Sequence, residues 1–381
     1  MDAVKPFASL YLHIPFCRSK CLYCDFESLP VGRAGCAGSL DSYLDVLSGL
    51  VARAGDDGLL RGVRTVYVGG GTPSLAGERL ADLVRLVRSY CDPDEFTCEA
   101  NPESLSAGLA SQLVDAGVTR LSLGVQSLRD AELASIGRIH SADLALSALM
   151  DALACGLDVS CDLMCGLPGQ TLESWSDTLD RLLGAGFALR HVSVYPLQLE
   201  DGTPLERMEA RGDIVLPDED FQAACMDLAA LRLESAGFSR YEVASYAREG
   251  AACAHNVSYW TGESYLGIGR SAAGMIDRGS DGRTRFVQLD DAGERYDVER
   301  LSAREAVAED LMLACRMSRG ISAALLERAK RVIPVGELDR ACERAVELGL
   351  ARWRSGSLEP THLGWLDGNQ LFGLFWGLAG E

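Results

Sequence analysis

The sequence has little that would mark a secreted, membrane-spanning or nucleic-acid-binding protein. Its first ten residues lack the cationic segment and apolar run of a secretory leader. The apolar stretch near its end, residues 371–379, is far shorter than the roughly 20 residues that a membrane-spanning helix needs. Basic residues number 36 against 55 acidic ones, and the resulting charge of −19 repels nucleic-acid phosphates and anionic membranes. We therefore expect a cytoplasmic protein that binds no nucleic acid.

Unusual composition is also absent. The chain has 381 residues, of which 48% are hydrophobic and 24% charged, as in ordinary globular proteins of two or three domains. Its 13 cysteines are odd in number, and the cytoplasm keeps thiols reduced, so a disulfide framework does not explain them. Some of these cysteines should be metal ligands.

The first half of the chain alternates strand and helix patterns. An apolar run, a turn and a stretch of helical periodicity recur about six times. The predicted strands are residues 10–14, 65–68, 96–99, 120–125, 159–164 and 191–195. Residues 75–90 and 172–183 have the apolar spacing of helices. Such alternation predicts an α/β fold in which parallel strands form an open, partial (β/α)6 barrel with its working face at their carboxyl ends.

The alternation stops after about residue 201, which predicts further domains. We place the barrel in residues 1–200, an α+β extension in 201–300 and a helical, winged-helix-like domain in 301–381. The extension should contain a helix over 217–237 and a loop or hairpin over 277–297. The last domain should contain helices over 302–316, 322–331 and 336–348 and a hairpin over 350–360.

Three cysteines follow the first predicted strand at close spacing. Cys17, Cys21 and Cys24 form a C-x3-C-x2-C run, and thiolates so close in sequence can converge on one soft metal centre. Structural zinc would need a fourth protein ligand. The nearby candidates are His13, Asp25 and Cys36. An iron–sulfur cluster on three cysteines would instead leave one iron open, and the spacing favours this cluster over zinc or over inert buried thiols.

With Tyr23 before its last cysteine, this run resembles the signature of the radical S-adenosylmethionine (SAM) superfamily. The resemblance covers almost the whole chain. It implies a [4Fe-4S] cluster on the three cysteines, whose open iron chelates the amino and carboxylate groups of SAM. It also implies an electron donor that reduces the cluster and cleavage of SAM to a 5′-deoxyadenosyl radical. Such chemistry needs a dry pocket that positions SAM beside the cluster.

Glycines and polar residues stand at the ends of successive predicted strands. The turn Gly-Gly-Gly-Thr-Pro at 69–73 would let a ligand approach the backbone closely. Alone, such a turn is more often structural, and a single polar residue at a strand end is more often solvated or capping. The resemblance implies that SAM is bound by Tyr11, Tyr23, Gly70, Gly71, Thr72, Glu99, Gln126, Arg138 and Asp162.

The order of motifs resembles the oxygen-independent coproporphyrinogen III oxidase family. These motifs lie at 11–17, 69–73, 123–127 and 166–171. True oxidases of that family have a fourth cysteine two residues after the third, and a longer segment before the first. Here Phe26 takes the place of that cysteine and 16 residues precede Cys17. The chain therefore resembles the haem chaperone branch of the family.

Residues 255–260 read His-Asn-Val-Ser-Tyr-Trp and resemble a motif implicated in haem binding in that branch. The resemblance implies His255 and Tyr259 as haem ligands, and imidazole and phenolate do ligate haem iron. The alternative is a buried aromatic cluster with a hydrogen-bonded histidine. Ala273 is a departure, because the family usually has histidine there.

The resemblance implies a haem chaperone that binds haem and transfers it to an acceptor protein. One alternative is a radical oxidase that decarboxylates coproporphyrinogen III. Another is a metal-stabilised nucleic-acid regulator, which the small basic excess of residues 319–355 disfavours. The apolar end, 371–378, favours a packed helix over contact with a membrane surface.

Overall fold

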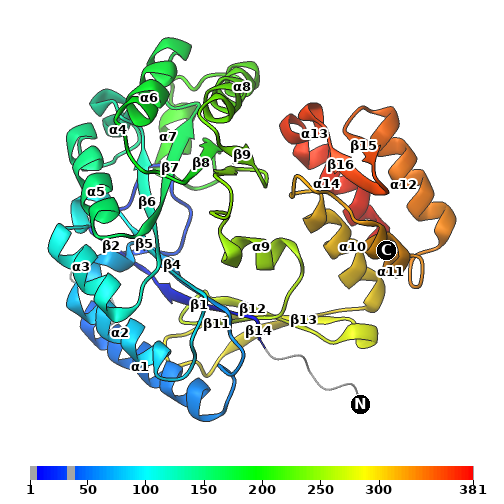
Figure 1. Cartoon of the computed structure of the whole chain (residues 1–381), viewed down its shortest axis with the longest axis horizontal. Helices are drawn as coiled ribbons and strands as arrows, with labels where there is room; N and C mark the ends of the chain where they lie inside the picture. The colour runs from blue at the N-terminus through cyan, green and yellow to red at the C-terminus, as the bar shows by residue number, and fades with distance from the viewer. Residues whose placement is uncertain (1–6, 32–38, 381) are drawn as a thin grey trace.

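The computed structural model describes residues 7–31 and 39–380. One 12-stranded sheet runs through the molecule in the order β14-β13-β12-β11-β1-β4-β5-β6-β7-β8-β10-β9. Six consecutive strands of this sheet, from β1 to β8, are parallel and form the partial barrel (Figure 1). They are β1 (Ser9–Ile14), β4 (Thr65–Gly70), β5 (Glu95–Ala100), β6 (Arg120–Gln126), β7 (Asp158–Cys165) and β8 (His191–Pro196). The predicted α/β barrel is confirmed.

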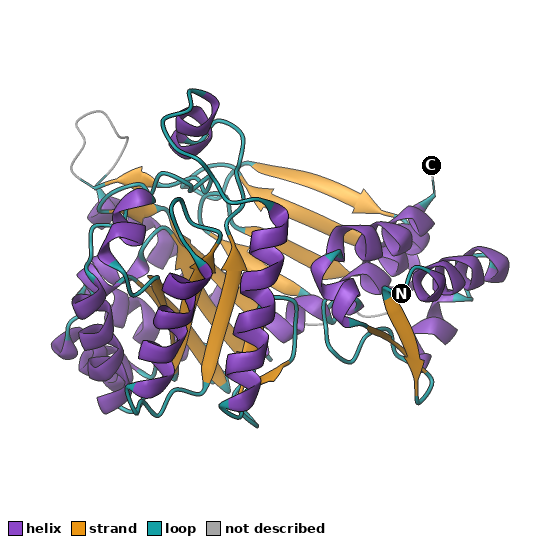
Figure 2. Cartoon of the chain, turned by 90° about the horizontal axis from the view of Figure 1, so that it is seen from above, coloured by secondary structure: helices purple, strands orange, loops and turns teal. Residues whose placement is uncertain are grey.

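Helices cover the outer side of these strands, as Figure 2 shows. They are α1 (Leu40–Asp56), α2 (Glu78–Arg88), α3 (Ala107–Ala116), α4 (Asp130–Ser135), α5 (Ala142–Ala154), α6 (Leu172–Gly184) and α8 (Glu219–Ser235). The short helix α7 (Pro204–Ala210) instead packs through Leu205 beside Leu22 and Tyr23. Single 3-10 turns lie at η1 (Pro73–Ala76), η2 (Pro102–Ser104), η3 (Gly279–Asp281) and η4 (Gly377–Ala379).

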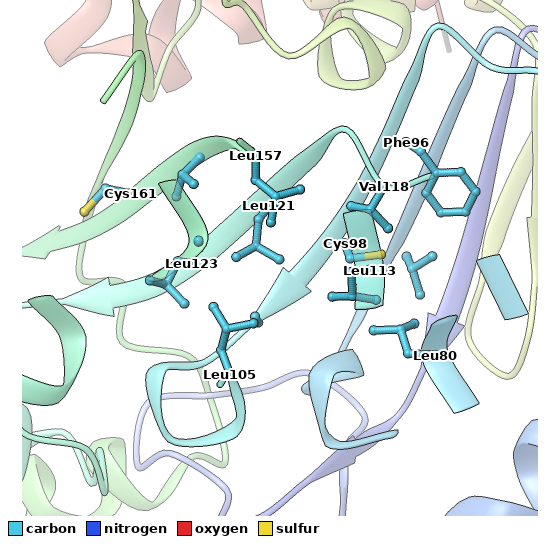
Figure 3. Packing of buried hydrophobic residues seen from close by; sticks show 14 of the residues in the cluster. Leu80, Phe96, Cys98, Leu105, Leu113, Val118, Leu121, Leu123, Leu157 and Cys161 are labelled. Atoms are coloured by element: carbon cyan, nitrogen blue, oxygen red, sulfur yellow. The ribbon is translucent and has the colours of Figure 1, made fainter. Parts of the chain in front are cut away.

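The period-2 alternation of the strands separates the core from the barrel interior. On β6, Leu121 and Leu123 pack into the buried cluster shown in Figure 3. Ser122 stands between them and lines the interior pocket. On β5, Phe96 and Cys98 belong to the same outer cluster. The apolar face therefore holds the helices, and the polar face is left for chemistry.

One predicted helix is shorter than the sequence indicated. Residues 75–90 should have been continuous, but a 3-10 turn ends at Ala76 and α2 runs only from Glu78 to Arg88. Gly77 separates them, because its backbone has φ +55° and ψ −129°, which no helical residue adopts.

Residues 239–301 extend the same sheet at both edges. The added strands are β9 (Ser239–Arg240), β10 (Ser245–Ala247), β11 (Tyr265–Ile268), β12 (Ala273–Asp277), β13 (Arg283–Gln288) and β14 (Tyr296–Leu301). Strand β11 pairs parallel with β1, and β10 pairs antiparallel with β8. Residues 277–297, predicted as a loop or hairpin, contain η3, β13 and the loop to β14, and β14 pairs antiparallel with β13 and ends at Leu301. Between the two edges lies the short helix α9 (Ala254–Trp260). The domain boundaries at residues 200 and 300 stay predictions.

The last region has its own core. Helices α10 (Ala303–Ala314), α11 (Ala323–Ala329) and α12 (Val335–Glu347) precede the hairpin β15 (Ala351–Arg354) and β16 (Ser357–Pro360), in the predicted order. Two helices follow, α13 (His362–Leu366) and α14 (Gly368–Trp376). Leu371, Phe372 and Phe375 are buried in this core, so the apolar end packs against its own domain. In the described ranges, no helix is long and apolar enough to cross a membrane.

Candidate functional site

The three cysteines lie at one pocket at the carboxyl ends of the barrel strands. Cys17, Cys21 and Cys24 line this cavity of about 460 Å³. Their loop is closed by two short parallel strands, β2 (Phe16–Cys17) and β3 (Leu29–Pro30). Within residues 7–31 and 39–380, no three histidine, cysteine or acidic side chains are grouped so as to hold a single metal ion. Cys36, a candidate fourth zinc ligand, lies outside the described residues.

The donor set of this loop suits a soft metal centre. Burial raises the pKa of Cys24 to about 11 and raises the pKa of Cys17, so both are thiols in the metal-free chain. Thr72 Oγ1 donates to Cys17 Sγ at 3.6 Å. Binding a metal centre would displace the thiol protons, because thiolates are the ligands.

The glycine turn after β4 forms a wall of the pocket where side chains would not fit. A Cβ atom at Gly71 would lie 2.5 Å from the Phe16 carbonyl oxygen. One at Gly70 would lie 2.8 Å from His13 Cε1, and Gly70 has φ +121°. The turn therefore needs glycine, and its bare backbone lies beside the cysteine loop.

Glu99 places its carboxylate in the pocket wall from the end of β5. Its Oε1 accepts a hydrogen bond from Tyr67 OH at 2.8 Å, and its Oε2 accepts one from Gly70 N at 3.0 Å. Burial raises the pKa of Glu99 to about 7, although both hydrogen bonds oppose this shift. An oriented carboxylate of this kind can accept from an ammonium group or a ribose hydroxyl.

Arg138 brings a cation into contact with the cysteine loop. Its Nη1 donates to Cys21 Sγ at 3.5 Å, and its Nη2 donates to Asn101 Oδ1 at 2.7 Å and Gly124 O at 2.6 Å. The guanidinium is thus held by two neighbouring strand ends. It can serve a bound carboxylate or a thiolate ligand from the same place.

Two further polar residues complete the strand ends. Asp162 accepts from Ser122 Oγ at 2.5 Å and from Ser160 Oγ at 2.8 Å, and burial raises the pKa of its carboxyl. Gln126 has φ +64°, at a shift in register between β6 and β7. Its amide is thereby turned into the pocket wall.

The pocket gathers most of the predicted SAM residues: Tyr23, Gly70, Gly71, Glu99, Gln126, Arg138 and Asp162. Tyr11 and Thr72 are not among the residues that line it. Tyr11 stacks on Tyr67, with ring centroids 6.2 Å apart, and its hydroxyl bonds to His13 Nδ1. The sequence reasoning missed Tyr67, Asn101 and Tyr195, which do line the pocket. Their alternation with apolar strand residues was the available signal for Tyr67 and Tyr195.

Comparison with known proteins shows the family of this chain. Residues 11–182 match the family model of the radical SAM superfamily. The heme chaperone HemW of Mycobacterium tuberculosis is 38% identical, over 94% of this chain and 95% of its own. HemW of Bacillus subtilis is 33% identical, over 97% and 99% of the two chains. The chain belongs to the HemW family of radical SAM proteins.

A solved structure supports the fold of this HemW-family chain. Coproporphyrinogen III oxidase (HemN) from Escherichia coli, a radical SAM enzyme, superimposes with a TM-score of 0.79 and covers 98% of this chain and 91% of its own. The two sequences are 21% identical, so the likeness shows a shared fold.

The motif at residues 255–260, predicted to bind haem, lies away from the cysteines, at the amino ends of the strands. His255 is only 1% exposed. Its Nδ1 bonds to Thr65 Oγ1 at 3.0 Å and its Nε2 to Tyr259 OH at 2.8 Å. Burial lowers the pKa of His255 to about 3, so the imidazole is neutral. Haem ligation by His255 and Tyr259 stays a prediction.

Proposed function

We propose that this HemW-family chain binds a [4Fe-4S] cluster and SAM, takes up haem and delivers it to an acceptor protein. The observation that carries the first part is the position of three cysteines on one pocket with a glycine turn and Glu99. The haem part is supported by the HemW relatives, which are named heme chaperones.

In this proposal Cys17, Cys21 and Cys24 hold three irons of the cluster and leave the fourth to SAM. When bound, the cluster supplies one electron at a time to the SAM beside it. The Gly70–Gly71 backbone and Glu99 hold the polar end of SAM. The Asp162 carboxylate accepts hydrogen bonds from the remaining polar groups of SAM, and the Gln126 amide can donate or accept them. The apolar outer core holds the strand ends that carry these side chains in place.

The protein would also need two partners. An electron donor must reach the cysteine loop, where Phe26 stands 64% exposed beside Cys24. A haem-accepting protein must take the cargo. We also propose a cytoplasmic location, and the acidic charge of the chain disfavours a nucleic-acid partner.

Anaerobic reconstitution tests the proposal. Wild-type protein should take up about four irons and four sulfides per chain, bind SAM, and shift the Soret band of added hemin, whereas Cys21→Ala should lose the cluster. A zinc-loaded protein without sulfide, or an unshifted Soret band, would contradict it. Production of protoporphyrinogen from coproporphyrinogen III under the same conditions would favour the oxidase instead.

A further inference from the structure

The helix α9 closes the amino end of the barrel with a chain of hydrogen bonds in which each donor is used once. Ser258 Oγ donates to the His255 carbonyl at 2.7 Å, so it accepts from Ser9 Oγ, 2.7 Å away. Ser9 Oγ in turn accepts from Thr65 Oγ1 at 2.8 Å. Because the Thr65 hydroxyl has one proton and donates it to Ser9, it must accept a hydrogen bond from His255 Nδ1, 3.0 Å away.

This chain fixes the state of the imidazole. Because Nδ1 carries the proton, Nε2 presents a lone pair, and Tyr259 OH donates to it at 2.8 Å. That lone pair is the one that would ligate haem iron, and the Tyr259 oxygen is turned to it. The two atoms predicted as haem ligands are therefore hydrogen-bonded to each other, with the His255 side chain buried and Tyr259 half-buried.

The helix is also held by the sheet. Both carboxylate oxygens of Glu95, at the start of β5, accept from the first backbone N–H groups of α9, with Ala254 N and His255 N each 2.9 Å away. A negative charge at this helix end is favourable. Figure 1 shows α9 between the barrel and the last domain.

The contacts continue from His255 through Tyr67 to the pocket at the carboxyl ends of the strands. The Tyr67 ring lies against the His255 imidazole, with centroids 5.2 Å apart and planes inclined by 30°. Tyr67 OH then donates to Glu99, which also accepts from Gly70 N. One aromatic ring thus separates the floor of the barrel from two residues of the proposed SAM pocket.

We propose that His255 and Tyr259 are positioning residues for the SAM pocket: through Thr65 and the Tyr67 ring they set the place of Glu99 and the Gly70 backbone, and haem binds elsewhere. This inference rests on the SAM binding proposed above. In this role His255 and Tyr259 keep the hydrogen bonds that they make in the structure, whereas haem ligation would break the bond between them.

The test uses variants that distinguish a positioning role for His255 and Tyr259 from haem ligation by them. Thr65→Val removes the partner of Nδ1 and touches no haem-ligand candidate. His255→Leu removes both hydrogen bonds, whereas His255→Gln keeps an amide donor and acceptor but has no imidazole. Trp260→Phe is the matched control, because Trp260 stacks on Arg316 and takes no part in the network.

SAM affinity is read from the change that SAM causes in the electron paramagnetic resonance (EPR) spectrum of the reduced cluster, and haem uptake from the hemin Soret band. Thr65→Val and His255→Leu should weaken SAM binding about three- to tenfold, the effect of losing one or two hydrogen bonds. His255→Gln should recover most of it, Trp260→Phe should match wild type, and all should take up hemin as wild type does.

Unchanged SAM affinity in both Thr65→Val and His255→Leu would overturn the inference, as would loss of the Soret shift in His255→Gln. Cluster content and circular dichroism identify any variant that fails to fold, and Thr65→Val, which is nearly isosteric, then decides alone. If wild type itself binds no SAM, the proposed function fails rather than this inference.

Discussion

The Arg138 guanidinium donates to Cys21 Sγ at 3.5 Å, from a position that two other hydrogen bonds fix. A buried cation that donates to a thiolate ligand favours the more negative, reduced state of a cluster. Arg138 therefore has two predicted tasks, since it also lines the proposed SAM pocket.

Replacing Arg138 should lower the reduction potential of the reconstituted cluster. In Arg138→Gln the positive charge is gone, and a tenfold loss of reduced-state stabilisation corresponds to about 59 mV for a one-electron couple. Arg138→Lys keeps the charge and should shift the potential less. An EPR-monitored redox titration without SAM measures this directly. Equal potentials in all three proteins would show that Arg138 does not act on the cluster.

Glu99 should make the stability of the metal-free chain depend on pH. Its pKa rises from an ordinary value of 4.5 to about 7 on folding, chiefly through burial. The folded state thus binds the proton more tightly, so this group's stabilisation is complete below about pH 4.5 and is lost as pH rises to about 7. The loss is at most about 1.4 kcal/mol per pH unit.

Glu99→Gln removes this titration. Urea unfolding at pH 5 and pH 7.5 should show that the variant gains stability relative to wild type at the higher pH, while Gln198→Ala, at the pocket mouth, tracks wild type. Parallel pH profiles for Glu99→Gln and wild type would contradict the raised pKa.

The sequence predicted the strands of the barrel because their signal is local. Leu10, Leu12 and Ile14 alternate with residues of the other face, and such a pattern needs no knowledge of partners. Pairing across the chain has no such signal. Nothing near Glu95 indicates that it caps a helix beginning at Ala254, and nothing in the motif at 255–260 indicates that its histidine bonds to Thr65.

Motif resemblance and geometry also contribute differently at the site. Resemblance selected Glu99 and Arg138, which the structure does bring to one pocket, but it also selected Tyr11, which lies behind Tyr67. The resemblance identifies residue types on the strands, but it does not show whether each side chain reaches the pocket or lies beneath another side chain. The layer depends on strand register, which only the folded sheet determines.

Gln126 should contribute backbone strain as well as an amide. A non-glycine residue at φ +64° costs about 1 kcal/mol or more relative to glycine. Gln126→Gly and Gln126→Ala both remove the amide, so both should weaken SAM binding, but Gln126→Gly should unfold at a higher denaturant concentration than Gln126→Ala. Equal unfolding midpoints would mean that the turn relaxes at no cost.

The last domain is tied to the sheet by a buried ionic cluster. Arg283 on β13 is 2% exposed at its side chain, donates to Asp310 Oδ1 at 2.6 Å and also bonds to Glu309. Both acids lie on α10. Arg283→Met should lower the free energy of unfolding by about 3 to 5 kcal/mol, because it leaves two buried carboxylates without their shared cation.

Arg85→Met is the control for this cluster, since it breaks an exposed pair with Asp82 and should cost at most about 1 kcal/mol. Chemical unfolding followed by circular dichroism gives both values, and limited proteolysis reports whether the domain after residue 302 loosens first. Arg285 and Arg328 also bond to the two acids. If these two arginines are enough to neutralise the buried acids, Arg283→Met will unfold at the same denaturant concentration as Arg85→Met, and the role given to Arg283 will be wrong.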